Sequence, residues 1–327
     1  MTTPSFEIAL DRPDSAASPL GAIAQVQATQ LMPTQFYEQY QKPGIPVLIS
    51  GLFEADTDWN LDYLCQQLGE TEFPIQDHGS SHRARDKRTW TGTGSGVDTI
   101  VMPFRQYADL LRSREAHQRD LYMGKCALHQ TPLGDTHAFE QLEAHLGLQT
   151  PFTPWSFWMG PAGHITHLHY DPMDGTLAQL HGAKRVILFP PSQLYNLYPF
   201  SVFNQVRYGM KLRPGHSRVY PDQPEFEQFP RLRAALPHRY EFTLNQGDLL
   251  YIPAGWWHEV IAQGDEMSCS VNRFWNVTPL SRALTSWSKW RIHLGSVLAL
   301  PHLVYALGQA LVSGNPAQKI RQLTLKL

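Results

Sequence analysis

The stretch HITHLHYDPMDG, residues 164–175, places three histidines and two aspartates within twelve positions. If residues 166–171 form a strand, side chains alternate between its two faces, so His167, His169 and Asp171 share one face. Imidazole nitrogens and carboxylate oxygens both bind divalent metals, so His169 and Asp171 can bind one ion together. Histidines hydrogen-bonded to nearby carboxylates are also common in protein cores, and a metal site therefore needs a third ligand from elsewhere.

A third ligand is available in the stretch LLYIPAGWWHEV, where His258 follows an apolar strand and a Pro-Ala-Gly bend. Two histidines and one carboxylate occupy one face of an octahedron and leave three positions open, as non-haem Fe(II) oxygenases require. The sequence thus predicts a metal site of His169, Asp171 and His258. We expect His164 and His167 to support the ligands or to face solvent. Because it shares the strand face, His167 is the main alternative ligand.

The composition is that of a globular protein with little net charge. Hydrophobic residues make up 42% and aromatic residues 11% of the 327 residues, which is enough for a large core. Lys and Arg number 27 against 29 Asp and Glu, so the net charge of −2 gives no general reason to expect a nucleic-acid partner. Cys65, Cys126 and Cys269 form no CxxC pair, and the first residues do not resemble a secretory signal. We therefore expect a cytoplasmic protein without disulfides.

The pattern of elements changes along the chain. Residues 34–69 predict a helix, a short strand at 47–50 and a second helix. Beyond residue 150, short apolar runs alternate with glycine turns such as HGAK and NQGD, a pattern typical of a β-barrel or sandwich. The basic segment 80–96 contains TGTGSG but lacks the GK[ST] ending of a phosphate-binding loop, so it is expected to be a flexible connection.

The chain returns to helical periodicity after Asn276. Its apolar run, residues 294–313, is interrupted by Pro301 and polar residues, and we do not expect it to cross a membrane. The run is too apolar to be left in water, so we expect it to pair with a second copy of the chain. Folding back on the barrel, or lying on an anionic lipid surface, are the alternatives. The expected interface residues are Gly295, Ala299, Leu303, Ala306, Leu307, Ala310 and Leu311.

Three stretches carry a family resemblance: HYDPMDGTLAQLHGAKRVILFPPSQLYNLYP, EFEQFPRLRAALP and NQGDLLYIPAGWWHEV. In order and spacing they resemble the Jumonji C-type, cupin-like Fe(II)/2-oxoglutarate oxygenases, and within them the group containing the asparaginyl hydroxylase of hypoxia-inducible factor. The resemblance implies a mainly β protein with a double-stranded β-helix (jelly-roll) core, N-terminal α/β elements and C-terminal helices. It implies a catalytic domain at 1–276, with the barrel core at about 120–276, and a C-terminal helical segment at 277–327 that forms a homodimer.

The resemblance also implies iron(II) at the three ligands named above and a pocket for 2-oxoglutarate. Lys184, fifteen residues after the first ligand, would pair with the far carboxylate, helped by the hydroxyls of Thr166 and Tyr122. From HGAK alone, a solvated turn lysine is the better interpretation of Lys184, and the family spacing reverses it. Asn272, in VNRFW, is a further candidate in uncertain register, and Gly175 stands where the asparaginyl hydroxylase has an asparagine.

These features predict a dioxygenase that uses Fe(II), 2-oxoglutarate and O₂ to hydroxylate a C–H bond. The leading substrate class is a protein or peptide side chain, with lysine demethylation less favoured. A tRNA base is the main enzymatic alternative, because other small members of the family that the chain resembles act there. The near-neutral charge counts against it, whereas the basic tail and the loop residues Arg83, Arg85, Lys87 and Arg88 leave it open. A metal-binding cupin without oxygenase activity is the non-enzymatic alternative. Trp155, Trp158, Trp256 and Trp257 would supply part of an apolar shell around the pocket, although core packing is the favoured interpretation of each tryptophan on its own.

Overall fold

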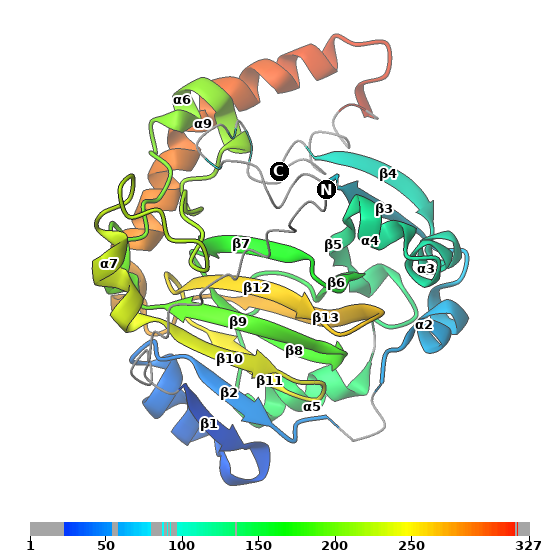
Figure 1. Ribbon diagram of the computed structural model, residues 1–327, viewed down its shortest axis with the longest axis horizontal. Coiled ribbons are helices and arrows are strands. Elements are labelled where there is room, and N and C mark those ends of the chain that lie inside the picture. The colour runs from blue at the N-terminus through cyan, green and yellow to red at the C-terminus, as the bar shows by residue number, and fades with distance from the viewer. Residues whose placement is uncertain are drawn as a thin grey trace, which may run out of the picture.

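The computed structural model describes residues 23–53, 58–79, 87, 90, 92, 97–134, 136–317 and 319. Within these residues the strands form one nine-stranded and one four-stranded sheet, which pack face to face (Figure 1). This arrangement confirms the predicted jelly-roll core with flanking helices. In spatial order the larger sheet contains β1 (Ala24–Gln27), β2 (Val47–Ser50), β11 (Leu249–Ile252), β8 (Asp174–His181), β13 (Met267–Trp275), β6 (Ser156–Pro161), β5 (Leu121–Ala127), β3 (Glu72–Asp77) and β4 (Asp98–Pro103).

The smaller sheet carries the residues singled out in the sequence. It is antiparallel throughout, and β7 is one of its edges. Its spatial order is β10 (Tyr240–Leu244), β9 (Ala183–Phe189), β12 (Trp257–Gln263) and β7 (Ile165–Tyr170).

Helices cover the outside of the barrel. The prediction for residues 34–69 is confirmed, since a helix, β2 and then α2 follow one another there. Asn60 caps α2, because its side chain accepts a hydrogen bond from the backbone N–H of Tyr63 at 2.9 Å. The helices are α1 (Pro33–Phe36), α2 (Leu61–Leu68), α3 (Phe104–Arg112), α4 (Glu115–Arg119), α5 (His137–Leu146), α6 (Asn204–Tyr208), α7 (Leu232–Ala235), α8 (Leu280–Thr285) and α9 (Trp287–Leu311).

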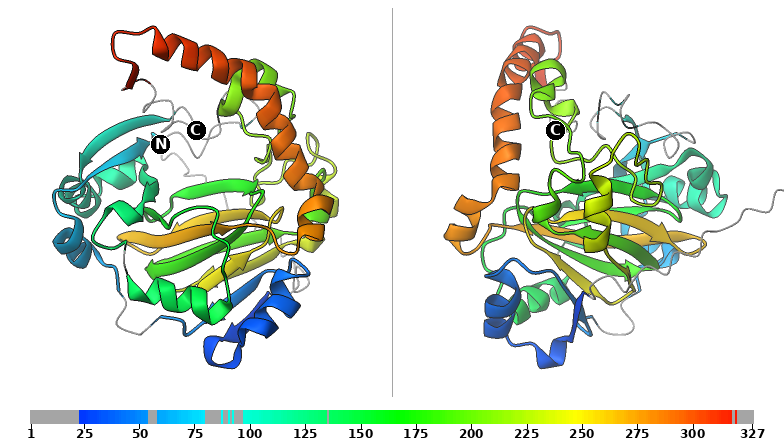
Figure 2. Two further views of the ribbon diagram at one scale, coloured as in Figure 1. Left: turned by 180° about the vertical axis from the view of Figure 1, so that it is seen from behind. Right: turned by 60° about the vertical axis from the view of Figure 1, so that its left-hand side comes forward.

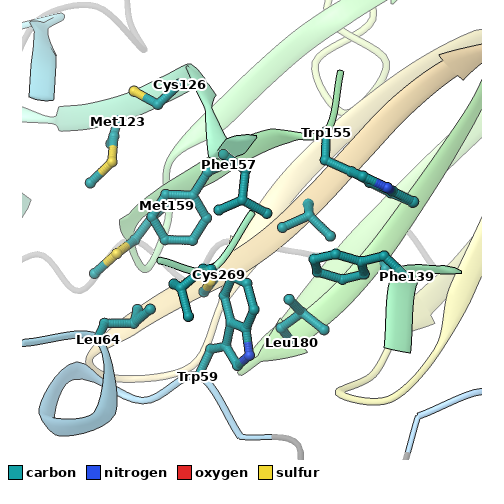
Figure 3. Packing of buried hydrophobic residues seen from close by; sticks show 14 of the residues in the cluster. Trp59, Leu64, Met123, Cys126, Phe139, Trp155, Phe157, Met159, Leu180 and Cys269 are labelled. Carbon is teal, nitrogen blue, oxygen red and sulfur yellow. The ribbon is translucent and has the colours of Figure 1, made fainter. Parts of the chain in front are cut away.

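Most buried apolar side chains pack in three clusters. One cluster lies between the sheets and includes Val186 and Leu188 of β9. A second lies on the outer face of the smaller sheet, beneath residues 194–235. The third and largest packs the outer face of the larger sheet against the N-terminal helices, where the Phe139 and Trp155 rings stack with centroids 4.9 Å apart (Figure 3). The two sheets therefore divide the core, and the cluster between them adjoins the inward-facing polar residues.

The HGAK turn joins β8 to β9 as expected. Gly182 there has φ +66°, and a Cβ atom at this position would lie 2.7 Å from the carbonyl oxygen of Met267. Only glycine fits this conformation and this close approach. The turn therefore fixes where β9 begins, and with it the position of Lys184.

One side of α9 packs on the same chain, close to α6 (Figure 2). Arg291 is buried and donates hydrogen bonds to the carbonyl oxygens of Pro214, at 2.7 Å, and Phe200. A Cβ at Gly295 would lie 2.8 Å from Pro214 Cγ, so glycine permits this contact. Because Gly295, Ala299 and Ala310 are buried within the chain, the expectation that they line a dimer interface is wrong.

The opposite side of α9 is apolar and exposed. Leu303 and Leu307 are half-buried, whereas Leu311 is exposed, so the predicted leucine face is only partly open. By length and composition α9 would be able to span a membrane. The exposed large apolar residues of α9 are Trp287, Trp290, Leu294, Val297, Leu300, Val304, Tyr305 and Leu311.

Candidate metal and cosubstrate site

Among the described residues, one group of side chains could hold a metal ion, and it consists of His169, Asp171 and His258. Its possible ligand atoms all lie within 4.8 Å of one another. Oδ2 of Asp171 is 3.9 Å from Nε2 of His169 and 3.5 Å from Nε2 of His258. The structure thus brings together the three ligands that the sequence predicted.

Neighbouring strands bring the two histidines together. His169 on β7 lies directly opposite His258 on β12 in the antiparallel register. Asp171 follows β7 immediately, and its carbonyl oxygen accepts a hydrogen bond from Gly255 N at 2.9 Å, which connects it to the bend before β12. The Pro-Ala-Gly bend therefore places the carboxylate beside the imidazoles.

A β-bulge in this strand pair alters the expected alternation of faces. The register shifts between His258 and Val260, so that Thr166 pairs with Val260 while His169 pairs with His258. His258 and Val260 are two residues apart and point to the same face, so Thr166 and His169 lie on that face although they are three residues apart. The simple alternation that grouped His167 with the ligands is therefore wrong.

His167 packs elsewhere. Its ring makes edge contacts with Trp90, at 5.1 Å between centroids, and with Tyr220, at 5.6 Å. Lys87 lies in the same cluster, fully buried, with its Nζ 3.9 Å from the centroid of the Tyr220 ring. Lys87 is therefore not a solvated charge for a nucleic acid, which corrects that expectation. Arg83, Arg85 and Arg88 lie outside the described residues, as does TGTGSG except Gly92.

The hydrogen bonds of both histidines suit metal binding. Nδ1 of His169 donates to the carbonyl oxygen of His167 at 2.8 Å, and Nδ1 of His258 donates to that of Trp256 at 3.0 Å. Because a carbonyl oxygen only accepts, each Nδ1 carries the proton and each Nε2 lone pair faces the carboxylate of Asp171. Burial, and next the neighbouring His169, lower the pKa of His258 to about 4, which keeps it neutral. This donor set fits iron(II), with three coordination positions left for other ligands.

Lys184 crosses the space between the sheets. Lys184 lies two and four residues before Val186 and Leu188 on β9, so all three side chains share one face of the strand. Val186 and Leu188 belong to the cluster between the sheets, and Lys184 therefore points inward. Its Nζ donates a hydrogen bond to Oγ of Ser270 on β13 of the opposite sheet. Only 5% of the residue is exposed, so the solvated-turn interpretation is wrong. Burial lowers the pKa of Lys184 to about 8.

Tyr122 and Thr166 adjoin this interior from two different sheets. Their side chains are hydrogen-bonded to each other, and burial raises the pKa of Tyr122. The Tyr122 ring needs glycine beneath it, because a Cβ at Gly160 would lie 2.2 Å from Tyr122 Cδ2. His164 stacks on the Tyr122 ring with centroids 3.6 Å apart, and its Nδ1 lies 2.8 Å from Oδ1 of Asp120. His164 therefore supports the tyrosine and does not face solvent.

Asn272 lies on the inner face of β13, two residues from Ser270. Its Oδ1 accepts a hydrogen bond from Trp158 Nε1 at 2.6 Å. Of the four tryptophans considered for the pocket, Trp158 lies beside Asn272. Trp256 belongs to the cluster between the sheets. Trp155 and Trp257 pack in the clusters on the outer faces of the sheets, which confirms core packing for these two and excludes them from the shell of the pocket.

Sequence reasoning missed three polar residues beside the triad. The ring of His216 stacks on His169 with centroids 5.0 Å apart, and these two residues form an isolated antiparallel bridge. Lys125, on a bulge of β5 with φ +59°, and Arg213 both interact electrostatically with Asp171. No local motif marks them, because they come from a bulge and from a long connection that returns to β7.

The comparisons with known proteins agree with this geometry. A model of the cupin-like domain family matches residues 33–281. tRNA wybutosine-synthesizing protein 5 of Homo sapiens is 37% identical over 262 residues, which cover 75% of each protein. Lysine-specific demethylase JMJ31 of Arabidopsis thaliana is 26% identical over 289 residues, covering 77% of this chain and 49% of that protein. Lysine-specific demethylase JMJ30 of the same plant is 28% identical over 252 residues, covering 74% of this chain and 52% of that protein.

The chain spans about half the length of the two plant demethylases. The closer resemblance to the asparaginyl hydroxylase group is not confirmed by these comparisons and stays a prediction. The JmjC relatives of this chain are 2-oxoglutarate-dependent oxygenases that use iron(II), which agrees with the group formed by His169, Asp171 and His258. Since the match extends over most of its length and includes every residue of the site, the chain belongs to the cupin-like domain family.

Proposed function

We propose that this protein is an Fe(II)- and 2-oxoglutarate-dependent hydroxylase. One observation carries the proposal: a candidate metal-binding triad, a buried lysine bonded to Ser270, and the paired hydroxyls of Tyr122 and Thr166 adjoin one interior between the sheets. A site that only binds metal has no need of a buried cation, because burying Lys184 without an anionic ligand lowers stability. The lysine therefore favours an oxygenase over a metal-binding cupin without activity.

Different residues would bind the metal ion and the cosubstrate. His169, Asp171 and His258 would hold iron(II) on one face. Lys184 would pair with the far carboxylate of 2-oxoglutarate, and the hydroxyls of Tyr122 and Thr166 would orient it. With both bound, the site supplies oxidative chemistry in which 2-oxoglutarate, O₂ and a C–H bond give succinate, CO₂ and an alcohol.

Water is kept from one side of this interior by apolar side chains. Val186 and Leu188 of β9, Leu250 of β11 and Val260 of β12 are all buried in the cluster between the sheets. A low-polarity wall strengthens the attraction between Lys184 and a carboxylate, and it limits side reactions with water.

The proposed substrate is a protein or peptide side chain, as the names of the two plant lysine demethylases suggest. A second candidate, an RNA base, is favoured by one observation: Lys125 and Arg213 place two positive charges beside Asp171. Cations near a metal site attract phosphate groups. The human relative, named for wybutosine synthesis on tRNA, agrees with this second candidate.

Turnover measured with two pools of candidate substrates tests both substrate classes, the peptide side chain and the RNA base. The iron-loaded protein is incubated with 2-oxoglutarate and isotopically labelled O₂, in the presence of either a peptide digest or total RNA from one lysate. We expect succinate formation above the pool-free background, with label incorporated into one pool only. Lys184→Ala serves as the inactive control. Absence of succinate with both pools, from protein shown to bind metal, would contradict the proposed hydroxylase.

A further inference from the structure

A buried carboxylate lies directly beside the metal-binding histidine of β12. Glu259 is only 4% exposed and stands at the β-bulge, where the register shift leaves His167 and Leu168 facing a single residue. Its Oε2 accepts a hydrogen bond from the backbone N–H of Leu168 at 3.1 Å. At a bulge the extra residue loses its ladder partner, and a buried N–H without a partner is costly. Glu259 supplies the acceptor that the opposite strand does not.

Lys87 balances the charge of this carboxylate. It is fully buried, and its charge attracts that of Glu259. Its Nζ donates to the carbonyl oxygen of Val219 at 2.9 Å and lies over the ring of Tyr220. A buried carboxylate is stable only with such compensation. The charge pair therefore joins Lys87 to Glu259 of β12, and Lys87 also contacts Val219 and Tyr220 in the connection between β9 and β10.

The bulge has a direct consequence for the site. It places Thr166 and His169 on one face although they are three residues apart. Without the extra residue, a one-residue change of register would turn Thr166 to the outer face and remove its contact with Tyr122. The bulge thus sets the spacing between His169, a predicted metal ligand, and the hydroxyl of Thr166, which is expected to orient 2-oxoglutarate.

We propose that Glu259 is a positioning residue: by accepting the Leu168 N–H, with Lys87 as its counter-charge, it holds the bulge that places His169 and Thr166 together. Its side chain bonds to the Leu168 N–H and faces Lys87, so it would act through the backbone and not as a ligand. For its effect on 2-oxoglutarate, the proposal rests on the proposed function. Its effects on the backbone and on metal binding do not.

Two charge-neutral double variants separate the hydrogen bond from the charge pair. Glu259→Gln with Lys87→Met keeps an acceptor for Leu168 N–H and removes both charges. Glu259→Leu with Lys87→Met removes the charges and the acceptor together. Neither leaves a lone buried charge, so both are expected to fold. Glu241→Gln, on the exposed β10, is the control for loss of a glutamate elsewhere in the same sheet.

The measurements need no turnover. Amide hydrogen exchange at Leu168 in the metal-free protein, the Kd for Mn(II), and the Kd for 2-oxoglutarate on the Mn(II)-loaded protein are compared. We expect the Gln/Met variant to resemble the wild type. We expect the Leu/Met variant to lose Leu168 protection and to weaken Mn(II) binding about 10- to 100-fold, as loss of a residue that orients a ligand does.

Each outcome bears on the proposal. Wild-type exchange and affinities in the Leu/Met variant would overturn it, as would equal losses in both variants, since the hydrogen bond would then not be the cause. If the wild type binds Mn(II) but not 2-oxoglutarate, the proposed function fails, while Leu168 exchange and Mn(II) affinity still test Glu259.

Discussion

Lys184 is the side chain that distinguishes an oxygenase interior from a simple metal site. It is buried, reaches across from β9 to Ser270 and lies among apolar neighbours. We predict that Lys184→Ala weakens 2-oxoglutarate binding to the Mn(II)-loaded protein by on the order of 2 to 5 kcal/mol, at least about thirty-fold in Kd. Isothermal titration measures it, with Mn(II) affinity as the control. Unchanged 2-oxoglutarate affinity with metal still bound would reduce Lys184 to a structural residue.

The same lysine predicts a pH dependence. Burial lowers the pKa of Lys184 to about 8, so its positive charge is present below that pH and is lost as pH rises through it. Burial raises the pKa of the neighbouring Cys269 and Tyr122, so neither titrates in this range. The Kd for 2-oxoglutarate should therefore rise between roughly pH 7 and pH 9. Lys184→Arg should flatten this profile because a guanidinium stays charged. A flat wild-type profile would contradict the assignment.

At the scale of elements, α8 is attached to the barrel by a buried ion pair. Arg282 binds both carboxylate oxygens of Asp174, which is fully buried and also accepts from Tyr251 Oη at 2.8 Å and Ala254 N at 2.9 Å. Arg282→Met leaves an uncompensated buried carboxylate, so we predict a loss of about 3 to 5 kcal/mol in the free energy of unfolding. Urea denaturation followed by fluorescence measures it.

An exposed ion pair provides the control for Arg282. The side chains of Arg105 and Glu70 are 61% and 78% exposed. Arg105→Met should therefore change the free energy of unfolding by no more than about 1 kcal/mol. Equal effects of the two substitutions would show that burial of Asp174 does not determine the cost.

The elements themselves were largely predictable from the sequence. The alternating runs and glycine turns after residue 150 correspond to observed strands and turns, since both follow from local periodicity. The bulge opposite Glu259 was not predictable, because an extra residue leaves the period-two pattern of a short strand almost unchanged. For the same reason strict alternation predicts that His167 shares a face with the ligands, and only the pairing with β12 separates them.

At the scale of the whole molecule, α9 leaves an apolar stripe uncovered. Val297 is 59%, Val304 67% and Leu311 64% exposed, on the side away from the contacts of Arg291 and Gly295. We predict that this stripe pairs two copies of the chain, because an apolar stripe of this length is costly to leave in water. Val304→Arg should give a monomer by light scattering coupled to gel filtration. Gln309→Arg, at an exposed polar position of α9 that lies off the stripe, should not.

The oligomeric state and the vesicle binding of the wild-type protein distinguish a dimer from attachment of α9 to a membrane surface. A monomer at micromolar concentration without detergent would contradict the dimer prediction. Binding of wild-type protein to anionic vesicles, lost in Val304→Arg, would instead support the membrane-surface alternative. The sequence showed that this helix is apolar, but which side faces the barrel depends on Pro214 and residues 200–208, far away in the chain.

The site was predictable where family-like spacing fixed it and not where distant segments meet. His169, Asp171, His258 and Lys184 lie where the sequence placed them relative to the turns. Lys87, His216 and Arg213 come from long connections whose return to the smaller sheet has no local signal. Contacts between segments so far apart in the chain leave no local pattern in the sequence.

The central claim is that His169, Asp171 and His258 bind one metal ion, and Mn(II) titration followed by electron paramagnetic resonance tests it most directly. We predict that alanine at any one of the three abolishes stoichiometric Mn(II) binding while circular dichroism shows the fold intact. His167→Ala is the matched control, because His167 lies on the same strand but packs against Trp90 and Tyr220. It should bind Mn(II) like the wild type. Retained binding in Asp171→Ala, or loss of binding in His167→Ala alone, would contradict this account.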